Sequence, residues 1–148
     1  MQRKPSPLVQ FHFLEPVSLT QRTLVKEAIR ELFKKEKTPL EQLQFIFCSD
    51  EYLLQINKQY LQHDYYTDII TFDLSANPGP VTGEIYISID RVKDNAQTFK
   101  ASFKQELLRV IFHGALHLCG YKDKSKKDEV AMRKAEDKYL HRYLSKAK

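Results

Sequence analysis

The sequence predicts an α+β fold, in which several helices pack on one small β-sheet. Four short segments in the first 90 residues alternate or cluster their apolar side chains as strands do, whereas the sequence after position 90 follows a helical period. The composition, 42% hydrophobic and 29% charged in 148 residues, is ordinary for a globular domain. No internal repeat or long linker is visible in the sequence, so we expect a single domain over residues 1–148.

The first strand and the first helix are expected before residue 40. Residues 8–14 alternate polar and apolar side chains with the period of two of a half-buried strand. Thr20 precedes a segment whose apolar residues, spaced three and four apart, share one helical face. Thr38 and Pro39 are expected to end this helix.

Three further strands and one short helix complete the predicted sheet region. Residues 45–48 form a short apolar run that is typical of a buried strand. Asp50 is expected to cap a helix that ends near Leu61. Strands are then predicted at residues 69–74 and 84–89, and the Asn-Pro-Gly-Pro segment between them suits a hairpin-like or a looping connection.

Three helices are expected in the remainder of the chain. Asp90 is a candidate cap for the first of them, Ser102 for the second and Ser125 for the third. Ser102 and Ser125 are each followed, three residues later, by a side chain that completes a capping box.

The end of the middle helix carries a candidate metal site. His113 and His117 are four residues apart, so their imidazoles project from nearly the same helical face. Gly120 can end the helix in the left-handed conformation, and the chain can then return Asp123 to the same ion. Two histidines and one carboxylate leave a fourth position for water, as in catalytic zinc sites. The other histidines, which lack such partners and are expected to be structural or solvated, are His12, His63 and His141.

Three motifs together resemble a known family. The run from His113 to Asp123 is similar to the signature His-Gly-x-Leu-His-Leu-x-Gly-Tyr-Asp-His. The other motifs are Ile56-Asn57 with residues 67–72, and residues 83–88 followed by Ala96. Their order and spacing over essentially the whole chain resemble the YbeY family of bacterial rRNA-maturation endoribonucleases.

This resemblance implies a single-strand-specific, metal-dependent endoribonuclease. The expected roles are maturation of the small-subunit rRNA at its 3′ end and ribosome quality control. The implied partner is single-stranded RNA, in particular rRNA on the small ribosomal subunit, with no membrane involved. The implied fold is a small mixed four-stranded sheet packed with about five helices around a zinc-peptidase-like (zincin-like) core.

The resemblance also assigns the site residues. His113 and His117 match two zinc ligands with a catalytic role, and the third position falls on Asp123, where the family usually has His. One Zn²⁺ per chain is therefore expected. Glu84 matches an acidic position of the family and is a further catalytic candidate, with a structural role on its strand as the alternative.

One departure concerns substrate phosphate. The family's phosphate-binding Arg falls on Leu61, which cannot contact a phosphate, so another cation must replace it. The candidates, by proximity to the motifs, are Lys58, Arg109, Lys122 and Lys124. Aromatic side chains that could stack on unpaired bases, or pack on their own domain instead, are Tyr60, Tyr65 and Tyr66.

Two other functions remain open. A metallopeptidase is suggested by the spacing of His113, His117, Gly120 and Asp123, but those enzymes carry a general-base Glu where this chain has Gly114. An RNA-binding ribosome-assembly factor with a structural metal would also account for the missing arginine.

Charge and cysteine content bear on the partner and the compartment. The net charge of +5 resides in residues 122–148, which hold ten basic and five acidic side chains. A solvated terminal helix explains such a run, and so does a surface that attracts RNA beside the metal site. The N-terminal segment lacks the apolar block of a signal peptide, and Cys48 and Cys119 are too few for a disulfide framework, so we expect a cytoplasmic protein.

Overall fold

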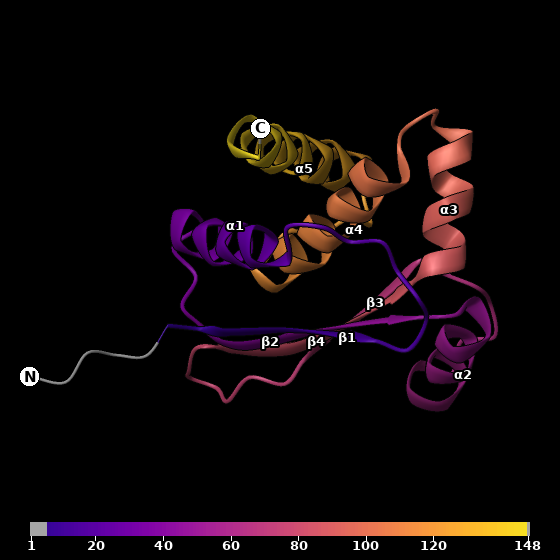
Figure 1. Cartoon of the computed structure of the whole chain (residues 1–148). Helices are drawn as coiled ribbons and strands as arrows, with labels where there is room; N and C mark the ends of the chain where they lie inside the picture. Colours follow the sequence, from indigo (N-terminus) through magenta and orange to yellow (C-terminus); the bar gives the residue numbers. More distant parts are fainter. Residues whose placement is uncertain (1–5, 148) are drawn as a thin grey trace, which may run out of the picture.

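Several helices cover one face of a mixed four-stranded sheet, and a single helix lies at one end of its other face (Figure 1). The structure, a computed structural model, describes residues 6–147; residues 1–5 and 148, which the expected domain includes, lie outside this range. The strands are β1 (Leu8–Phe13), β2 (Leu40–Cys48), β3 (Ile69–Asp73) and β4 (Val81–Ser88). Their order is β1-β2-β4-β3, with β3 antiparallel to β4 and the other neighbouring pairs parallel. The predicted mixed sheet is therefore confirmed.

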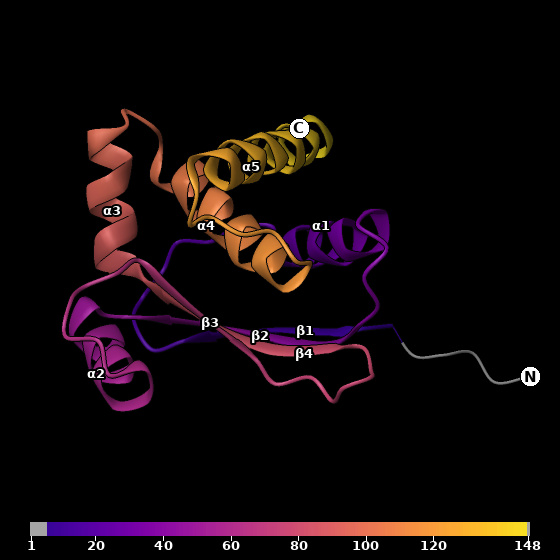
Figure 2. The ribbon, with the colours of Figure 1, turned by 180° about the vertical axis from the view of Figure 1, so that it is seen from behind.

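Five helices accompany the sheet in the described part of the chain. They are α1 (Arg22–Lys35), α2 (Asp50–Leu61), α3 (Ile89–Thr98), α4 (Phe103–Leu118) and α5 (Lys126–Lys146). Helices α1, α4 and α5 lie on one face of the sheet, and α2 lies on the other face (Figures 1 and 2). This arrangement confirms the α+β class, and none of these helices is long and apolar enough to cross a membrane.

Helix α4 is central to the core. It contacts β3 and β4 below it and α1, α3 and α5 around it, so its apolar residues are buried on several sides. Ile85 and Ile87 of β4 alternate towards it and are fully buried. Gly114 of α4 lies against the sheet, where an added Cβ would be 2.9 Å from Ile85 Cγ2 and 3.0 Å from Ile69 Cδ1. The absence of a side chain at this position lets α4 lie close to the sheet.

Two of the expected helix caps are wrong by one or two residues. Ser49 and Ser88, both with extended backbones, are the N-caps of α2 and α3, and each side chain accepts a hydrogen bond from the N–H three residues on. Asp50 and Asp90 lie in the first turn instead, where the helix dipole favours a carboxylate. Asp90 Oδ2 also accepts the N–H of Asp50, at 2.8 Å, which ties the two helix starts together.

Other predicted boundaries agree more closely. Ser102 and Ser125 cap α4 and α5 as expected. β2 begins at Leu40, five residues earlier than predicted, and β4 begins at Val81, three residues earlier. The first residues of both strands alternate polar and apolar and continue the ladder between them. β3 and β4 form an antiparallel pair, so of the two connections considered between them the structure has the hairpin-like one.

Helix α5 is fastened to α1 through two acidic residues. Glu31 of α1 accepts hydrogen bonds from Lys146 and Arg142 of α5, which hold the pKa of this carboxyl below its ordinary value. The Tyr139 hydroxyl donates to Glu36, just after α1. These contacts fix the position of α5 above α4, which brings one face of α5 to the histidine pair.

Candidate metal centre

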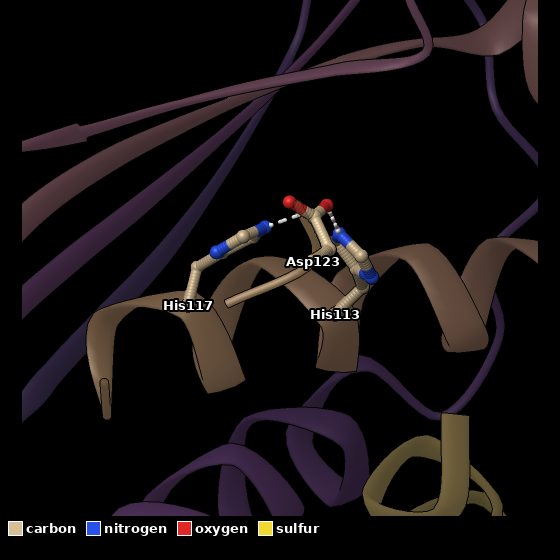
Figure 3. Close-up of side chains that lie close together, drawn as sticks. All are labelled: His113, His117 and Asp123. Carbon is tan, nitrogen blue, oxygen red and sulfur yellow. Dashed lines mark hydrogen bonds and ion pairs between the residues drawn. The ribbon is translucent and has the colours of Figure 1, made fainter. Parts of the chain in front are cut away.

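The two histidines of the predicted site lie on the exposed end of α4. His113 and His117 are one turn apart, and their ring centroids are 4.7 Å from each other. The remaining faces of α4 are buried, so the helix presents only this edge to solvent. Figure 3 shows both imidazoles projecting from the same side of the helix towards the carboxylate of Asp123.

A tight turn returns the chain to these rings. The N–H of Gly120 donates to the carbonyl of His117, and Gly120 adopts a φ of 102°, in the region that favours glycine. Asp123 then lies with Oδ2 3.3 Å from His113 Nε2 and 3.1 Å from His117 Nε2. The structure thus brings together the three residues that the sequence proposed as metal ligands.

Each imidazole uses its other nitrogen in a hydrogen bond. His113 Nδ1 donates to Oε2 of Glu136 at 2.6 Å, and His117 Nδ1 donates to the carbonyl oxygen of Tyr121 at 3.0 Å. A hydrogen bond at Nδ1 fixes the tautomer and leaves Nε2 as the nitrogen available to a metal. Both Nε2 atoms are therefore oriented as ligands on the side where Asp123 lies.

Glu136 was missed by the sequence reasoning. It belongs to α5 and is only 5% exposed, in a stripe of buried residues that includes Met132, Tyr139 and Tyr143. An acidic residue within an apolar helical stripe is unusual, because a buried carboxylate requires a partner. This irregularity in the stripe was the available signal.

Acidic groups surround the histidine pair. Burial disfavours the charged form of His113, but the hydrogen bond and charge of Glu136, together with Asp123, outweigh it and raise the pKa of His113 above its ordinary value. Burial also raises the pKa of Asp68, against the lowering effect of His113. An acidic environment of this kind attracts a cation.

The geometry of the trio fits a small divalent ion. One ligand atom from each residue lies within 4.8 Å of the others. Two ligands of a tetrahedral ion, each at about 2.0–2.1 Å, are separated by roughly 3.3 Å, close to both distances between the imidazoles and Asp123. Two of the three pairs of ligand atoms are therefore already close to the spacing that a bound metal requires.

The trio lies in a cleft of about 590 Å³. The cleft runs between α4, the edge strand β3 and the loop after α2. Its lining residues are Asn57, Leu61, His63, Tyr65, Thr67, Asp68, Ile69, Ile70, Thr71, Asp73, His113, His117, Leu118 and Asp123. His63, which was expected to be structural or solvated, and Tyr65, a candidate for base stacking or for packing on its own domain, therefore lie in the same hollow as the candidate ligands.

Glu84 is not brought to this cleft. It alternates with the buried Ile85, so it lies on the face of the sheet that carries α2, opposite α4. There its Oε1 accepts a hydrogen bond from the Tyr86 hydroxyl at 3.1 Å. Burial and this hydrogen bond raise the pKa of Tyr86 to about 12.

The four cations proposed for substrate phosphate are also outside the cleft lining. Lys58 pairs with Asp64 at 3.4 Å. Arg109 is occupied by Glu136 and Asp137, at 3.1 and 2.7 Å. Lys122 lines a separate hollow next to Gly120, and Lys124 is exposed.

A second hollow adjoins the trio on its α5 side. It contains His113 and Asp123 together with Lys126, Arg133 and Lys134. Basic side chains therefore approach the candidate metal centre from α5, from positions that the phosphate candidates did not include.

Comparison with known proteins identifies the family. Residues 14–144 match the family described as Endoribonuclease YbeY. The chain belongs to the YbeY family. It is 55% identical over 122 residues to an Endoribonuclease YbeY of Cytophaga hutchinsonii, a match that covers 82% of this chain and 85% of the relative. It is 48% identical over 130 residues to one from Porphyromonas gingivalis, covering 86% and 85%.

A solved structure resembles the fold as well. The solution structure of TM1509 from Thermotoga maritima superposes with a TM-score of 0.63 at 30% sequence identity, covering 94% of this chain and 93% of that one. Membership of the YbeY family accounts for the three linked motifs. Within this family member, Asp123 takes the third position of the trio, and Leu61 lies in the cleft wall.

Proposed function

We propose that this YbeY-family chain is a metal-dependent endoribonuclease that cuts single-stranded RNA, with the whole chain acting as one catalytic domain. The observation that carries the proposal is the convergence of His113, His117 and Asp123 in an open cleft. The match of residues 14–144 to the endoribonuclease family supports the reaction class.

The metal in this proposal is one Zn²⁺ per chain. His113, His117 and Asp123 would hold it, because two neutral imidazoles and one carboxylate are a typical donor set for catalytic zinc. When bound, zinc supplies Lewis acidity towards a phosphoryl oxygen and lowers the pKa of a bound water.

The protein's own residues orient this donor set and shape the cleft. Glu136 and the Tyr121 carbonyl hold the two rings through Nδ1. Arg109 binds Glu136 at 3.1 Å, so its role is to keep that carboxylate in place rather than to bind phosphate. Glu84 has no part in the proposal, since it lies across the sheet from the cleft.

The proposed substrate is rRNA on the small ribosomal subunit, near the 3′ end, and the proposed compartment is the cytoplasm. Ribosome quality control belongs to the same proposal. The names of the relatives, all Endoribonuclease YbeY, support an RNA substrate.

A metallopeptidase is less well supported by this geometry. Gly114, at the position of the peptidase general base, packs against Ile85 and Ile69, so the position faces the sheet rather than the cleft. A non-catalytic assembly factor with a structural metal would not need the open cleft beside the ligands.

The proposal is tested by nuclease assays on the purified chain. We expect cleavage of single-stranded RNA and little cleavage of a matched duplex or of casein. His117→Ala should lower the rate of RNA cleavage by more than about 100-fold. Removal of a residue that only hydrogen-bonds a metal ligand lowers activity by roughly 10- to 100-fold, and His117 is itself a proposed ligand. His141→Ala is the matched control, because His141 is exposed on α5 and lies outside the cleft lining.

Two results would contradict the proposal. One is RNA cleavage that survives both His117→Ala and chelation. The other is purified, active protein containing less than about half an equivalent of zinc, measured by elemental analysis. RNA binding without cutting would favour the assembly factor, and casein cleavage would favour the peptidase.

A further inference from the structure

We propose that the stacked rings of His63 and Tyr65 form a base-stacking site for an unpaired nucleobase of single-stranded RNA. The inference rests on the proposed function, because it names the part of the substrate that the cleft recognises. It concerns the rim of the cleft, where the loop after α2 faces the histidine pair.

The two rings already form an aromatic platform. Their centroids are 5.0 Å apart with an interplanar angle of 20°, and the Tyr65 hydroxyl lies 2.9 Å from His63 Nδ1, within hydrogen-bond distance. Both side chains are exposed, and Tyr65 is 56% accessible. Large aromatic rings left exposed in this way are available to stack on a further planar group.

The platform is held in place by a buried residue. Asn57, at the end of α2, is 2% exposed, and its side-chain Nδ2 donates to the carbonyl of Tyr65 at 2.9 Å. The backbone carbonyl oxygen of Asn57 accepts a hydrogen bond from the backbone N–H of His63 at 3.1 Å. Gln62, which lies between Asn57 and His63 in the sequence, adopts a φ of 56°, which is uncommon for a residue other than glycine. One buried asparagine therefore anchors both halves of the stacked pair.

The charge of the cleft favours a base over a phosphate at this rim. Among the described residues that line the cleft, there is no lysine or arginine, whereas Asp68, Asp73 and Asp123 are present. The nearest basic residue on α2, Lys58, is paired with Asp64. Leu61, in the same wall, adds apolar surface. The side chains of this wall therefore offer no cation to a phosphate, and they offer apolar surface to the face of a base.

Stacking also explains a preference for single strands. In a duplex, the faces of each base are covered by its neighbours, so an aromatic platform has nothing to contact. In a single strand, one base can leave the stack and cover Tyr65, while the next phosphate reaches the candidate metal centre in the same cleft. Selectivity then comes from the platform rather than from a phosphate clamp.

The test measures RNA binding by the full chain as purified, using a fluorescent 2′-O-methyl RNA octamer whose integrity is checked by gel. Tyr65→Ala should weaken binding of the single strand about tenfold. Tyr65→Phe, which keeps the ring, should bind within about twofold of wild type. An octamer carrying 2-aminopurine should be quenched by wild type and not by Tyr65→Ala.

Tyr60→Ala is the matched control. Tyr60 is equally exposed, at 61%, but its ring contacts Phe72 and lies outside the cleft lining. We expect its affinity for RNA to equal that of wild type. Equal losses for Tyr60→Ala and Tyr65→Ala, unchanged binding by Tyr65→Ala, or a loss for Tyr65→Phe as large as for Tyr65→Ala would each overturn the base-stacking site.

This experiment separates the inference from the proposed nuclease activity. Binding and quenching are read without cleavage, so they stand even if the chain does not cut RNA. If wild type cuts RNA while Tyr65→Ala leaves its KM unchanged, only the base-stacking site is wrong. A raised KM with an unchanged kcat for Tyr65→Ala supports both the base-stacking site and the proposed nuclease activity. Melting temperatures within about 2 °C of wild type exclude unfolding as the cause.

Discussion

The contact between Glu136 and His113 is the most consequential pair in the candidate metal centre. It joins α4 to α5, with 2.6 Å between His113 Nδ1 and Glu136 Oε2, and the Glu136 side chain is nearly inaccessible to solvent. A carboxylate in this position orients the ring and raises its basicity, which strengthens metal binding. Glu136 therefore acts on the site without being one of the three ligands.

Glu136→Gln should lower the affinity for zinc by about 10- to 100-fold, because the amide keeps the shape but removes the charge. The measurement is a competition titration of the apo-protein with a chromophoric chelator, which requires no RNA. Glu129→Gln, a change at an exposed position on the same helix, is the control and should bind zinc as wild type does. An unchanged affinity in Glu136→Gln would refute the positioning role.

The sequence predicted the three candidate ligands but not this partner. His113, His117 and Asp123 lie within eleven residues, so helical periodicity and one glycine turn are enough to bring them together. Glu136 meets His113 only because α5 crosses α4 at a particular place, which depends on tertiary packing. For the same reason the sequence could not show that Arg109 is already occupied by Glu136 and Asp137.

At the scale of elements, two glycines allow close packing of α4 on the sheet: Gly83 of β4, where an added Cβ would lie 2.8 Å from Leu118 Cδ1, and Gly114 of α4 itself. Gly114 immediately follows the first histidine, and its missing side chain lets α4 approach Ile85. A glycine within a helix lowers the stability of the helix by about 1 kcal/mol relative to alanine. We attribute the glycine at this position to the narrow space between α4 and the sheet, which has no room for a Cβ.

Gly114→Ala should lower the free energy of unfolding by about 1 kcal/mol, since overpacking of about 1–3 kcal/mol exceeds the gain in helix propensity. Urea denaturation measures this loss. Ile85→Val removes Cδ1, one of the crowding atoms, so the loss caused by Gly114→Ala should be smaller in that background. Equal losses in both backgrounds would show that the contact with Ile85 is not responsible.

The hydrophobic period predicted every helix and strand, but it located their ends less well. The caps of α2 and α3 fall on Ser49 and Ser88 because a serine with an extended backbone precedes each acidic residue. The extra residues of β2 and β4 are polar on one side, and their pairing is visible only once the two strands are neighbours. Strand order itself was not readable, because β4 enters the sheet between β2 and β3.

For the whole molecule, the excess positive charge lies close to the candidate site. Lys126 and Lys134 enter the hollow that adjoins His113, while the cleft itself is acidic. We therefore expect the RNA backbone to lie along the start of α5, with the strand entering the cleft from that side.

Replacing Lys126 and Lys134, the two lysines of this hollow, by glutamine should reduce the salt dependence of RNA binding. For single strands the slope of log K against log salt should fall in magnitude by about 1.4, since each phosphate contact contributes about 0.7. Lys93→Gln with Lys100→Gln removes the same charge from α3 and the loop that follows it, and it should leave the slope near the wild-type value. Equal slopes for the two double variants would mean that net charge, rather than its position, controls binding.

Helix α5 also has a consequence for how the protein is made. Synthesis proceeds from the N-terminus, so His113 and His117 leave the ribosome before Glu136 and before Lys146 and Arg142, which fasten α5 to Glu31. Until α5 has been translated, the nascent chain holds both imidazoles without the carboxylate that orients one of them. A chain built in this order completes its candidate metal centre late, after the sheet and the first four helices have been synthesised.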